Sequence, residues 1–398
     1  MKKKLCRITA LLLAAVLSLG GCGQPGAGKK RTDSTQQTEE TKNKKEDQSK
    51  SDKKGPEIDG LTYESTMDLT YATEFDVYDY KDGYKLLDVH EDRQYLVVPE
   101  GKEAPEGLSE DIVVLQQPLD HIYMAATAIM SLLDAVDAID QVKFSGLNAE
   151  DAKKAMESGD MIYAGKYSEP DYETLVNGEC DLAVESTMIL HTPKVQEMIE
   201  DLDIPVFVDY SSYESHPLGR TEWIKLYGAM LNKEDAADSF FEKQAQVIEK
   251  LKGFENTEKT VAYFYVNTDG SIVVRKSEDY IPSMIEIAGG RYAFKNLKNV
   301  DSNAPSVKLT MEEFYATAVD ADYLIYNGTI DGQVKSISDL EAKSNLFSEF
   351  KAVKEGNVWY TGKNLYQATD TVGELIMDMH LMLTDGDPKE MTFLEKMK

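Results

Sequence analysis

DYSSYESHPLGRTEWIKLYGAMLNKEDAADSFFEKQAQVIEKL, residues 209–251, is the stretch around which the rest of the chain is organised. Its second part predicts a long helix over residues 232–252, because Asn232 can act as the N-cap and Asp235 lies in the first turn, where the helix dipole favours an acidic side chain. A mostly apolar stripe at helical spacing supports this helix: Ala237, Phe240, Phe241, Gln244, Ile248 and Leu251. At ~1.5 Å per residue, such a helix would be a rod of roughly 30 Å. The first part, residues 209–231, predicts a loop that runs into a short helix. We expect the rod to join two lobes, and the loop before it to face the cleft between them.

Strands and helices alternate on both sides of the predicted rod. On the amino-terminal side, strand-like runs such as VKFSG and DLAVES are separated by helical patterns, and TVAYFYVNT and ADYLIYN continue the scheme after it. This alternation is typical of parallel sheets with right-handed crossovers. The predicted fold is therefore α/β, with two Rossmann-like lobes over residues 112–231 and 253–398. Their mostly parallel sheets are joined by a single long rigid α-helix.

Residues 58–111 follow a different pattern, in which the alternating runs TYESTMDLTYATEFDVYDY, YKLLDV and RQYLVVP are separated by short turns. This pattern predicts an N-terminal β-hairpin region. The sequence leaves open whether this region contacts an extra partner or only adds a layer of strands.

The chain begins with the pattern of a secretory signal. Basic residues precede an apolar run that is too short to span a membrane and that ends in small residues at Cys22. Leu19-Gly20-Gly21-Cys22 resembles a bacterial lipobox, which implies removal of residues 1–21 and lipidation of the Cys22 sulfur. An ordinary signal peptide is the alternative. Residues 22–57 contain almost nothing apolar, so we expect them to be a disordered tether. The predicted location is the cell membrane, with a lipid anchor on the extracytoplasmic face.

Charge and cysteine content narrow the range of partners. The formal net charge is −28, and the residues after position 58 include 64 acidic but only 30 basic side chains. Such a body repels nucleic acid and anionic lipid, so we expect no nucleic-acid partner and membrane contact through the lipid anchor only. Cys180 is the one cysteine left in the body of the protein, and we expect it to be a small buried side chain.

Candidate binding residues follow from the rule that ligands of open parallel sheets lie beyond the carboxyl ends of the strands. The rule selects Tyr167, Ser186, Tyr210, Tyr213, His216 and Arg220 in the first lobe, and Tyr265, Arg275, Tyr326, Tyr360 and Tyr366 in the second. Tyrosine suits a planar ligand with polar edges, and the two arginines can pair with carboxylates or phosphates. Capping of strand ends by tyrosine and surface salt bridges by arginine are the alternatives.

Catalytic and metal motifs do not occur in the sequence. The histidines are scattered, and there is no H-E-x-x-H, G-x-S-x-G, P-loop or Cys-rich cluster. We therefore predict a protein that is not an enzyme and that needs no cofactor and no resident metal. An exported lipoprotein enzyme is one alternative. A zinc or manganese receptor is another, for which Glu185, His191 and His216 could supply part of the ligand set.

Three stretches carry a resemblance to a known family: AGKYSEPDYETLVNGECDLAVEST, then YESHPLGRTEWIKLYGAML with NKEDAADSFFEKQ, and IEIAGG with LTMEEF and DADYLIYN. In this order, over about residues 112–398, they resemble the solute-binding lipoproteins of ABC importers that capture iron–siderophore complexes, haem and cobalamin. The resemblance implies a monomer that captures an iron–siderophore-type metal chelate between its lobes and delivers it to the permease. Cobalamin or haem is the alternative cargo.

The resemblance also implies one exposed docking glutamate in each lobe, which pairs with arginines of the permease. By position these are Glu173 and Glu312, with Glu313 as a rival to the second. The alternative is that all three are acids of a first helical turn, favoured there by the dipole. Ligand-binding residues vary with the cargo in this family, so none is assigned by the resemblance.

Overall fold

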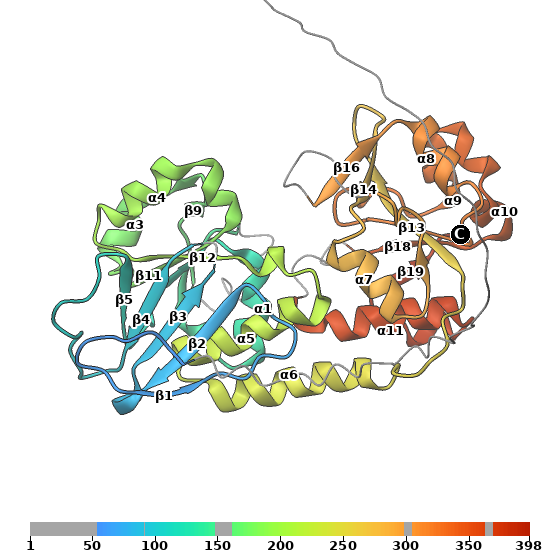
Figure 1. Cartoon of the computed structure of the whole chain (residues 1–398). Helices are drawn as coiled ribbons and strands as arrows, with labels where there is room; N and C mark the ends of the chain where they lie inside the picture. Colours follow the sequence, from blue (N-terminus) through green and yellow to red (C-terminus); the bar gives the residue numbers. More distant parts are fainter. Residues whose placement is uncertain (1–53, 91, 148–160, 298–304, 363–368) are drawn as a thin grey trace, which may run out of the picture. The chain divides into compact units, whose positions relative to one another are not determined.

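The computed structural model describes residues 54–90, 92–147, 161–297, 305–362 and 369–398 (Figure 1). The predicted signal peptide, Cys22, most of the tether, a predicted helix over residues 151–159 and Tyr366 lie outside these ranges. Asp52–Lys398 forms one compact unit. None of the helices in the described ranges has both the length and the apolar character needed to cross a membrane.

An N-terminal sheet of five strands precedes the two α/β lobes. Its order is β1 (Tyr63–Thr66), β2 (Phe75–Tyr80), β3 (Lys85–Val89), β4 (Gln94–Val98), β5 (Ile112–Gln116). The first four strands pair antiparallel, and β5 runs parallel to β4. The sheet thus extends past position 111, where the sequence analysis ended the hairpin region. Phe75 and Leu87 are buried in the core of the first lobe, whereas Tyr80 and Leu86 form a smaller cluster of their own. The region is therefore built into the first lobe as an added layer of strands.

The first lobe contains the predicted parallel sheet. All its strand pairs are parallel, in the order β12 (Val206–Asp209), β11 (Leu182–Ser186), β6 (Ile122–Met124), β7 (Val142–Ser145), β8 (Ile162–Tyr163). The described α-helices that accompany it are α1 (Met130–Ala135), α3 (Tyr172–Asn177), α4 (Pro193–Glu200) and α5 (Pro217–Leu231). Strands β12, β11, β6 and β7 are mostly buried, as expected when both faces of a parallel sheet are covered, whereas the edge strand β8 is exposed.

The second lobe has a mixed sheet with a parallel centre. The order is β16 (Ser306–Leu309), β14 (Ile272–Arg275), β13 (Thr260–Val266), β17 (Tyr323–Tyr326), β18 (Val358–Thr361), β19 (Leu394–Lys396), and β15 (Arg291–Tyr292) also pairs with β13. The pairs of β17 with β13 and β18 are parallel, and those of β14 and β19 are antiparallel. The described α-helices are α7 (Tyr280–Ile287), α8 (Met311–Ala318), α9 (Ile337–Lys343), α10 (Lys351–Glu355) and α11 (Val372–Leu383). Buried Asp378 of α11 fastens β19, because one of its carboxylate oxygens accepts the backbone N–H groups of Thr392, Phe393 and Leu394.

The stretch that organises the chain forms two helices of nearly equal length. Helix α5 has 15 residues, and α6 (Glu234–Glu249) has 16, which corresponds to ~24 Å. Asn232 was predicted to be the N-cap of the long helix, but it does not cap α6. It ends α5 in the left-handed conformation, with φ 56°, and its N–H donates to the carbonyl of Gly228. The long helix is therefore shorter at both ends than residues 232–252, and the predicted short helix before it is α5, which is nearly as long as α6.

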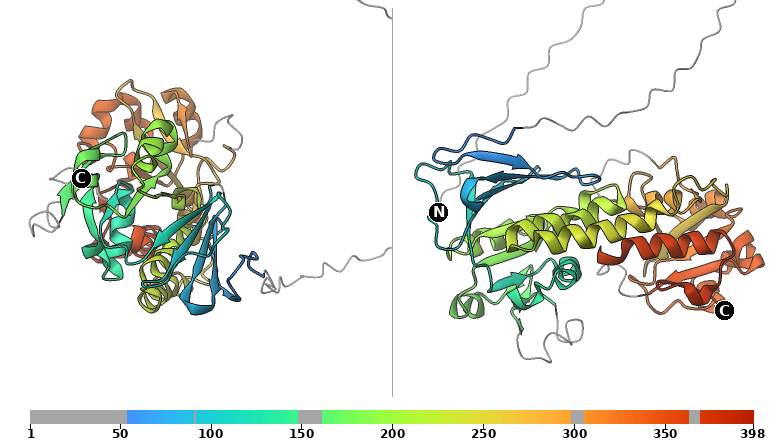
Figure 2. Two further views of the ribbon diagram at one scale, coloured as in Figure 1. Left: turned by 90° about the vertical axis from the view of Figure 1, so that its left-hand side faces the viewer. Right: turned by 90° about the horizontal axis from the view of Figure 1, so that it is seen from below.

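The two lobes meet through several helices rather than through α6 alone. Helix α6 buries Phe241 in the core of the first lobe, and Ile248 packs against the cores of both lobes. Helix α11 of the second lobe packs against α6 and α5, and Figure 2 shows the three helices side by side. Thr221 of α5 also donates a hydrogen bond of 2.9 Å to the carbonyl oxygen of Thr369. A single connecting rod is therefore not confirmed.

Candidate functional site

The loops after β11 and β12 meet at the carboxyl edge of the first sheet. Ser186 ends β11 and caps the short helix that follows, accepting the N–H of Met188. The hydroxyls of Thr187 and Ser212 lie 3.4 Å apart and join the two loops. After β12, the buried ring of Tyr210 meets the exposed ring of Tyr213 edge-on at 5.2 Å. The structure therefore brings three of the predicted binding residues to one edge. Tyr167 is half-buried in a turn between β9 (Gly165–Lys166) and β10 (Glu169–Pro170).

His216 lies at the start of α5 and is engaged within the protein. Its Nδ1 accepts the N–H of Leu218, so it serves as the N-cap of α5. Its ring stacks on Tyr71 of the N-terminal sheet region at 4.4 Å and 18°. Burial lowers the pKa of His216, so the ring stays neutral near pH 7. These contacts order the turn into α5, and a ligand-binding role for His216 stays a prediction.

The two predicted arginines meet at one tyrosine that the sequence analysis did not select. The guanidinium of Arg220, on α5 of the first lobe, lies 4.1 Å from the ring centre of Tyr280. The guanidinium of Arg275, at the end of β14 of the second lobe, lies 5.9 Å from the same ring and 3.4 Å from the Asp279 carboxylate. Burial raises the pKa of Asp279, and the positive charges of Arg275 and Arg220 oppose that effect. Two cations from different lobes thus converge on one aromatic ring.

Arg220 differs from Arg275 in its ion pairing. The Arg275 guanidinium pairs with Asp279, whereas no carboxylate among the described residues lies within ion-pairing distance of the half-buried Arg220 guanidinium. Tyr280 is the first residue of α7, which Asp279 caps, so the rule for residues beyond the carboxyl ends of strands did not select it. The convergence depends on the way the lobes pack, which local sequence does not report.

The tyrosines of the second lobe are largely committed to its interior. Tyr326 and Tyr360 are buried and face each other across β17 and β18. The Tyr326 hydroxyl donates to Asp331, and the Tyr360 hydroxyl donates to Glu395. Burial and the Glu395 carboxylate raise the pKa of Tyr360 to about 12. Tyr265 is half-buried within β13. Ligand-binding roles for these side chains remain predictions.

Glu185 is a fully buried acid at the end of β11. Neither of its carboxylate oxygens has a hydrogen-bond partner within the part of the chain that the structure describes. Burial raises its pKa to about 8. The described residues do not gather Glu185, His191 and His216 into a group with adjacent ligating atoms. The partial ligand set of the zinc or manganese alternative is therefore not assembled.

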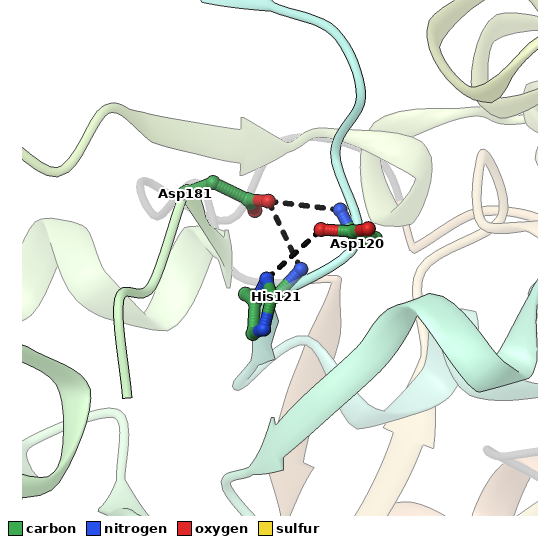
Figure 3. A group of neighbouring side chains, drawn as sticks. All are labelled: Asp120, His121 and Asp181. Carbon is green, nitrogen blue, oxygen red and sulfur yellow. Dashed lines mark hydrogen bonds and ion pairs between the residues drawn. The ribbon is translucent and has the colours of Figure 1, made fainter. Parts of the chain in front are cut away.

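The one group of adjacent metal-type ligands among the described residues is Asp120, His121 and Asp181 (Figure 3). These residues precede β6 and β11, at the amino ends of the strands and thus at the edge opposite the binding loops. One Asp181 oxygen accepts the N–H groups of Asp120 and His121 at 2.8 and 2.9 Å, and His121 Nδ1 lies 2.9 Å from Asp120 Oδ1. These hydrogen bonds fix the start of the two strands and account for the cluster.

The predicted docking glutamates are exposed at helix starts in different lobes. Glu173 lies in the first turn of α3, which is capped by Asp171, and Glu312 lies in the first turn of α8. Glu313 has another role, because its carboxylate accepts the N–H of Thr310 in a capping box. Of the two rivals, Glu312 is therefore the one whose carboxylate is not used to cap its own helix.

Comparisons with known proteins agree with this architecture. A sequence profile described as periplasmic binding protein matches residues 122–365. Two uncharacterized lipoproteins of Methanocaldococcus jannaschii are similar in sequence. One is 26% identical over 304 residues, covering 70% of this chain and 69% of the relative. The other is 24% identical over 397 residues, covering 96% and 95%.

Solved structures share the fold at low sequence identity. An ABC transporter substrate-binding protein from Listeria monocytogenes has a TM-score of 0.52 and 19% identity, with 67% of this chain and 98% of that chain covered. The periplasmic heme binding protein HutB of Vibrio cholerae has a TM-score of 0.53 and 14% identity, with 64% and 97% covered. The petrobactin-binding protein YclQ from Bacillus subtilis has a TM-score of 0.53 and 17% identity, with 66% and 92% covered.

The profile match spans more than half of the chain, and its bounds enclose most of both α/β lobes but exclude the N-terminal sheet. The chain belongs to the periplasmic binding protein family, and it is accordingly a binding component of a transporter rather than an enzyme.

Proposed function

We propose that this protein is the extracytoplasmic substrate-binding lipoprotein of an ABC importer. As a monomer, it captures an iron–siderophore-type metal chelate between its two lobes and delivers it to the permease. Family membership, the lipobox-like Cys22 and the lipoprotein names of two relatives support this proposal. The names of two structural neighbours, a heme and a petrobactin binder, support a metal-chelate cargo. Haem and cobalamin are the alternative cargoes, and a zinc or manganese ion is a more distant one.

The observation that carries the proposal is the convergence of Arg220 and Arg275 on Tyr280. A half-buried guanidinium without a carboxylate partner is costly unless an anion completes it, and charge-assisted hydrogen bonds to a ligand carboxylate or catecholate would do so. Tyr280 itself is buried in the core of the second lobe, so its ring supports the Arg220 guanidinium rather than facing a ligand. An anionic chelate matches this site better than a bare cation does, because two positive charges repel a cation.

Titration calorimetry on the purified protein tests the cargo class. The probes are a ferric catecholate siderophore, a ferric hydroxamate siderophore, haemin, cyanocobalamin, and zinc and manganese chlorides. We expect one chelate to bind with micromolar affinity or tighter. Tight binding of zinc or manganese, with no binding of any chelate, would replace this proposal by the metal-ion alternative.

The arginine assignment has its own test. We expect Arg220→Ala to weaken binding of the chelate by about tenfold to a hundredfold, because a charge-assisted hydrogen bond contributes roughly 1.5–3 kcal/mol. Arg291→Ala is the matched control, since Arg291 forms an exposed ion pair with Glu258 in the same lobe as Arg275. Equal affinity of the wild type and Arg220→Ala for the bound chelate would remove Arg220 from the site.

A further inference from the structure

Residues 67–74, which we call the latch segment, connect β1 to β2 of the N-terminal sheet and lie against α5. Five consecutive backbone N–H groups, from Thr70 to Glu74, donate to two glutamates of the first lobe. Glu222 accepts the first three at 2.7–3.1 Å. Glu214 accepts the other two at 2.9–3.0 Å.

The two glutamates that hold the latch segment are themselves buried. Glu222 is 0% exposed and Glu214 is 2% exposed. Glu214 also accepts the Thr73 hydroxyl and the indole N–H of Trp223, each at 3.0 Å. A buried carboxylate that loses its donors is strongly destabilising, so the glutamates and the latch segment stabilise each other. The latch segment is therefore held rigidly against α5.

The latch segment contacts the turn that begins α5. Tyr71 stacks on His216, the N-cap whose Nδ1 and carbonyl oxygen accept the N–H groups of the first helical turn. Gly219 lies so close to the segment that an added Cβ would stand 3.0 Å from both the Tyr71 carbonyl oxygen and the Glu214 carboxylate. Arg220 follows directly, and its N–H points to the carbonyl of His216 at 3.4 Å. The backbone that carries Arg220 is thus fixed from the side of the N-terminal sheet.

We propose that the latch segment is a positioning element for the binding site. The latch segment acts through the backbone: it fixes the first turn of α5 and so places the Arg220 guanidinium over Tyr280. This gives a function to the N-terminal sheet, which lies outside the residues matched by the family profile. The effect on ligand affinity rests on the proposed function, whereas the effect on α5 does not.

The first experiment needs no ligand. Hydrogen exchange is measured by mass spectrometry on the whole protein, as wild type and as Tyr71→Leu, Glu214→Gln and Tyr84→Leu. Tyr84 is the control, because it lies in the same N-terminal region but its hydroxyl bonds to the carbonyl of Glu103, away from α5. We expect amides 218–220 to exchange at least tenfold faster in Tyr71→Leu and Glu214→Gln and unchanged in Tyr84→Leu. Unchanged exchange at 218–220 in both test variants would overturn the proposal.

The second experiment separates positioning from general stability by a double-mutant cycle. Affinity for haemin and for a ferric catecholate siderophore is measured in wild type, Tyr71→Leu, Arg220→Ala and the double variant. We expect Tyr71→Leu to weaken binding about tenfold in the wild type but less than twofold in the Arg220→Ala background, because the latch segment acts through Arg220. Equal losses in both backgrounds would overturn the positioning role. If the wild type binds neither probe nor any other chelate tested, the proposed function fails. Hydrogen exchange alone then tests whether the latch segment fixes the first turn of α5.

Discussion

Glu185 shows how much a single side chain can depend on its surroundings. Its carboxylate is buried on β11, and its charge adds to the effect of burial in raising the pKa values of Tyr123 of β6 and Tyr172 of α3. With both oxygens buried and unpartnered within the described residues, the neutral acid is the form that the fold accepts.

The pH dependence of stability should report Glu185. Its pKa is raised from 4.5 to about 8, so the stabilising contribution of the protonated form is complete below pH 4.5 and is lost as the pH rises through about 8. We expect this group to lower the free energy of unfolding by about 3 kcal/mol between pH 5 and pH 7.5. Glu185→Gln cannot ionise and should lack that loss. Urea unfolding of both proteins at the two pH values measures the difference.

Glu197→Gln, at an exposed position of α4, controls for the removal of one negative charge. If Glu185→Gln and the wild type lose the same stability between pH 5 and pH 7.5, the buried carboxyl does not titrate in this range, and the assignment is wrong.

Residue types at strand ends were predictable, but their competing contacts were not. The rule for parallel sheets placed Ser186, Tyr210 and Tyr213 at one edge, as found. It could not show that the hydroxyls of Tyr326 and Tyr360 already bond to carboxylates within the second lobe. Those acids lie five and 35 residues away along the chain, and only the folded sheet brings them near.

Asn232 explains the main error at the scale of helices. Asparagine is favoured both as an N-cap and as a left-handed residue that ends a helix. The sequence Asn-Lys between two helical patterns therefore does not show whether Asn232 ends the first helix or begins the second. Asn232 was predicted to be an N-cap, and in the structure it ends α5. The close packing of α5 on α6 requires this sharp reversal: at Gly228 an added Cβ would stand 2.7 Å from that of Ala237.

The left-handed conformation of Asn232 can be tested directly. We expect Asn232→Gly to leave stability unchanged within about 0.5 kcal/mol, and Asn232→Val to lower it by about 1–2 kcal/mol, because a β-branched side chain is strained at positive φ. Gln246→Val on the exposed face of α6 is the control and should cost only a few tenths of a kcal/mol. Thermal or urea unfolding measures all three. A variant Asn232→Val as stable as the glycine variant would contradict the left-handed assignment.

The proposed docking to a permease concerns the whole molecule, because it would use one glutamate from each lobe. We expect the pair of changes Glu173→Ala and Glu312→Ala to leave chelate affinity unchanged and to lower uptake into cells at least tenfold, since one charge-assisted contact in each lobe orients the complex. Radiolabelled iron uptake and calorimetry measure the two quantities. Glu197→Ala with Glu349→Ala, two other exposed acids, is the control pair. Normal uptake by the Glu173→Ala, Glu312→Ala variant would withdraw the docking assignment.

The proposed lipid anchor also concerns the whole chain, although Cys22 lies outside the described residues. We expect Cys22→Ser to move the protein from the membrane fraction to the soluble extracytoplasmic fraction, because firm anchoring needs acyl chains that serine at this position does not receive. Fractionation and immunoblotting measure the distribution, with Cys180→Ser as the control for loss of a thiol. Retention of Cys22→Ser in the membrane would show that another feature holds the protein there.

The order of strands and helices along the chain was predictable, whereas the contacts that join the two lobes were not. Local periodicity marks strands and helices, and alternation predicts parallel sheets, which the first lobe confirms. The contacts of α11 with α5 and α6, and those of Glu222 with Thr70, link residues more than a hundred positions apart. No pattern within a single stretch encodes such pairs, so the sequence supported one connecting rod where the protein uses a layer of helices.

Residues near both ends of the body contact buried acids, which has a practical consequence for the choice of a recombinant fragment. A recombinant fragment cut to the limits of the family profile, residues 122–365, would discard the backbone donors of Glu214 and Glu222, together with β19 and with Asp378 that fastens it. The fragment would leave the Trp223 indole N–H as the remaining partner of Glu214 and the Lys225 ammonium as that of Glu222, and it would expose the edge of β18. The shortest fragment that retains these interactions starts before Thr70 and includes every residue up to Lys398.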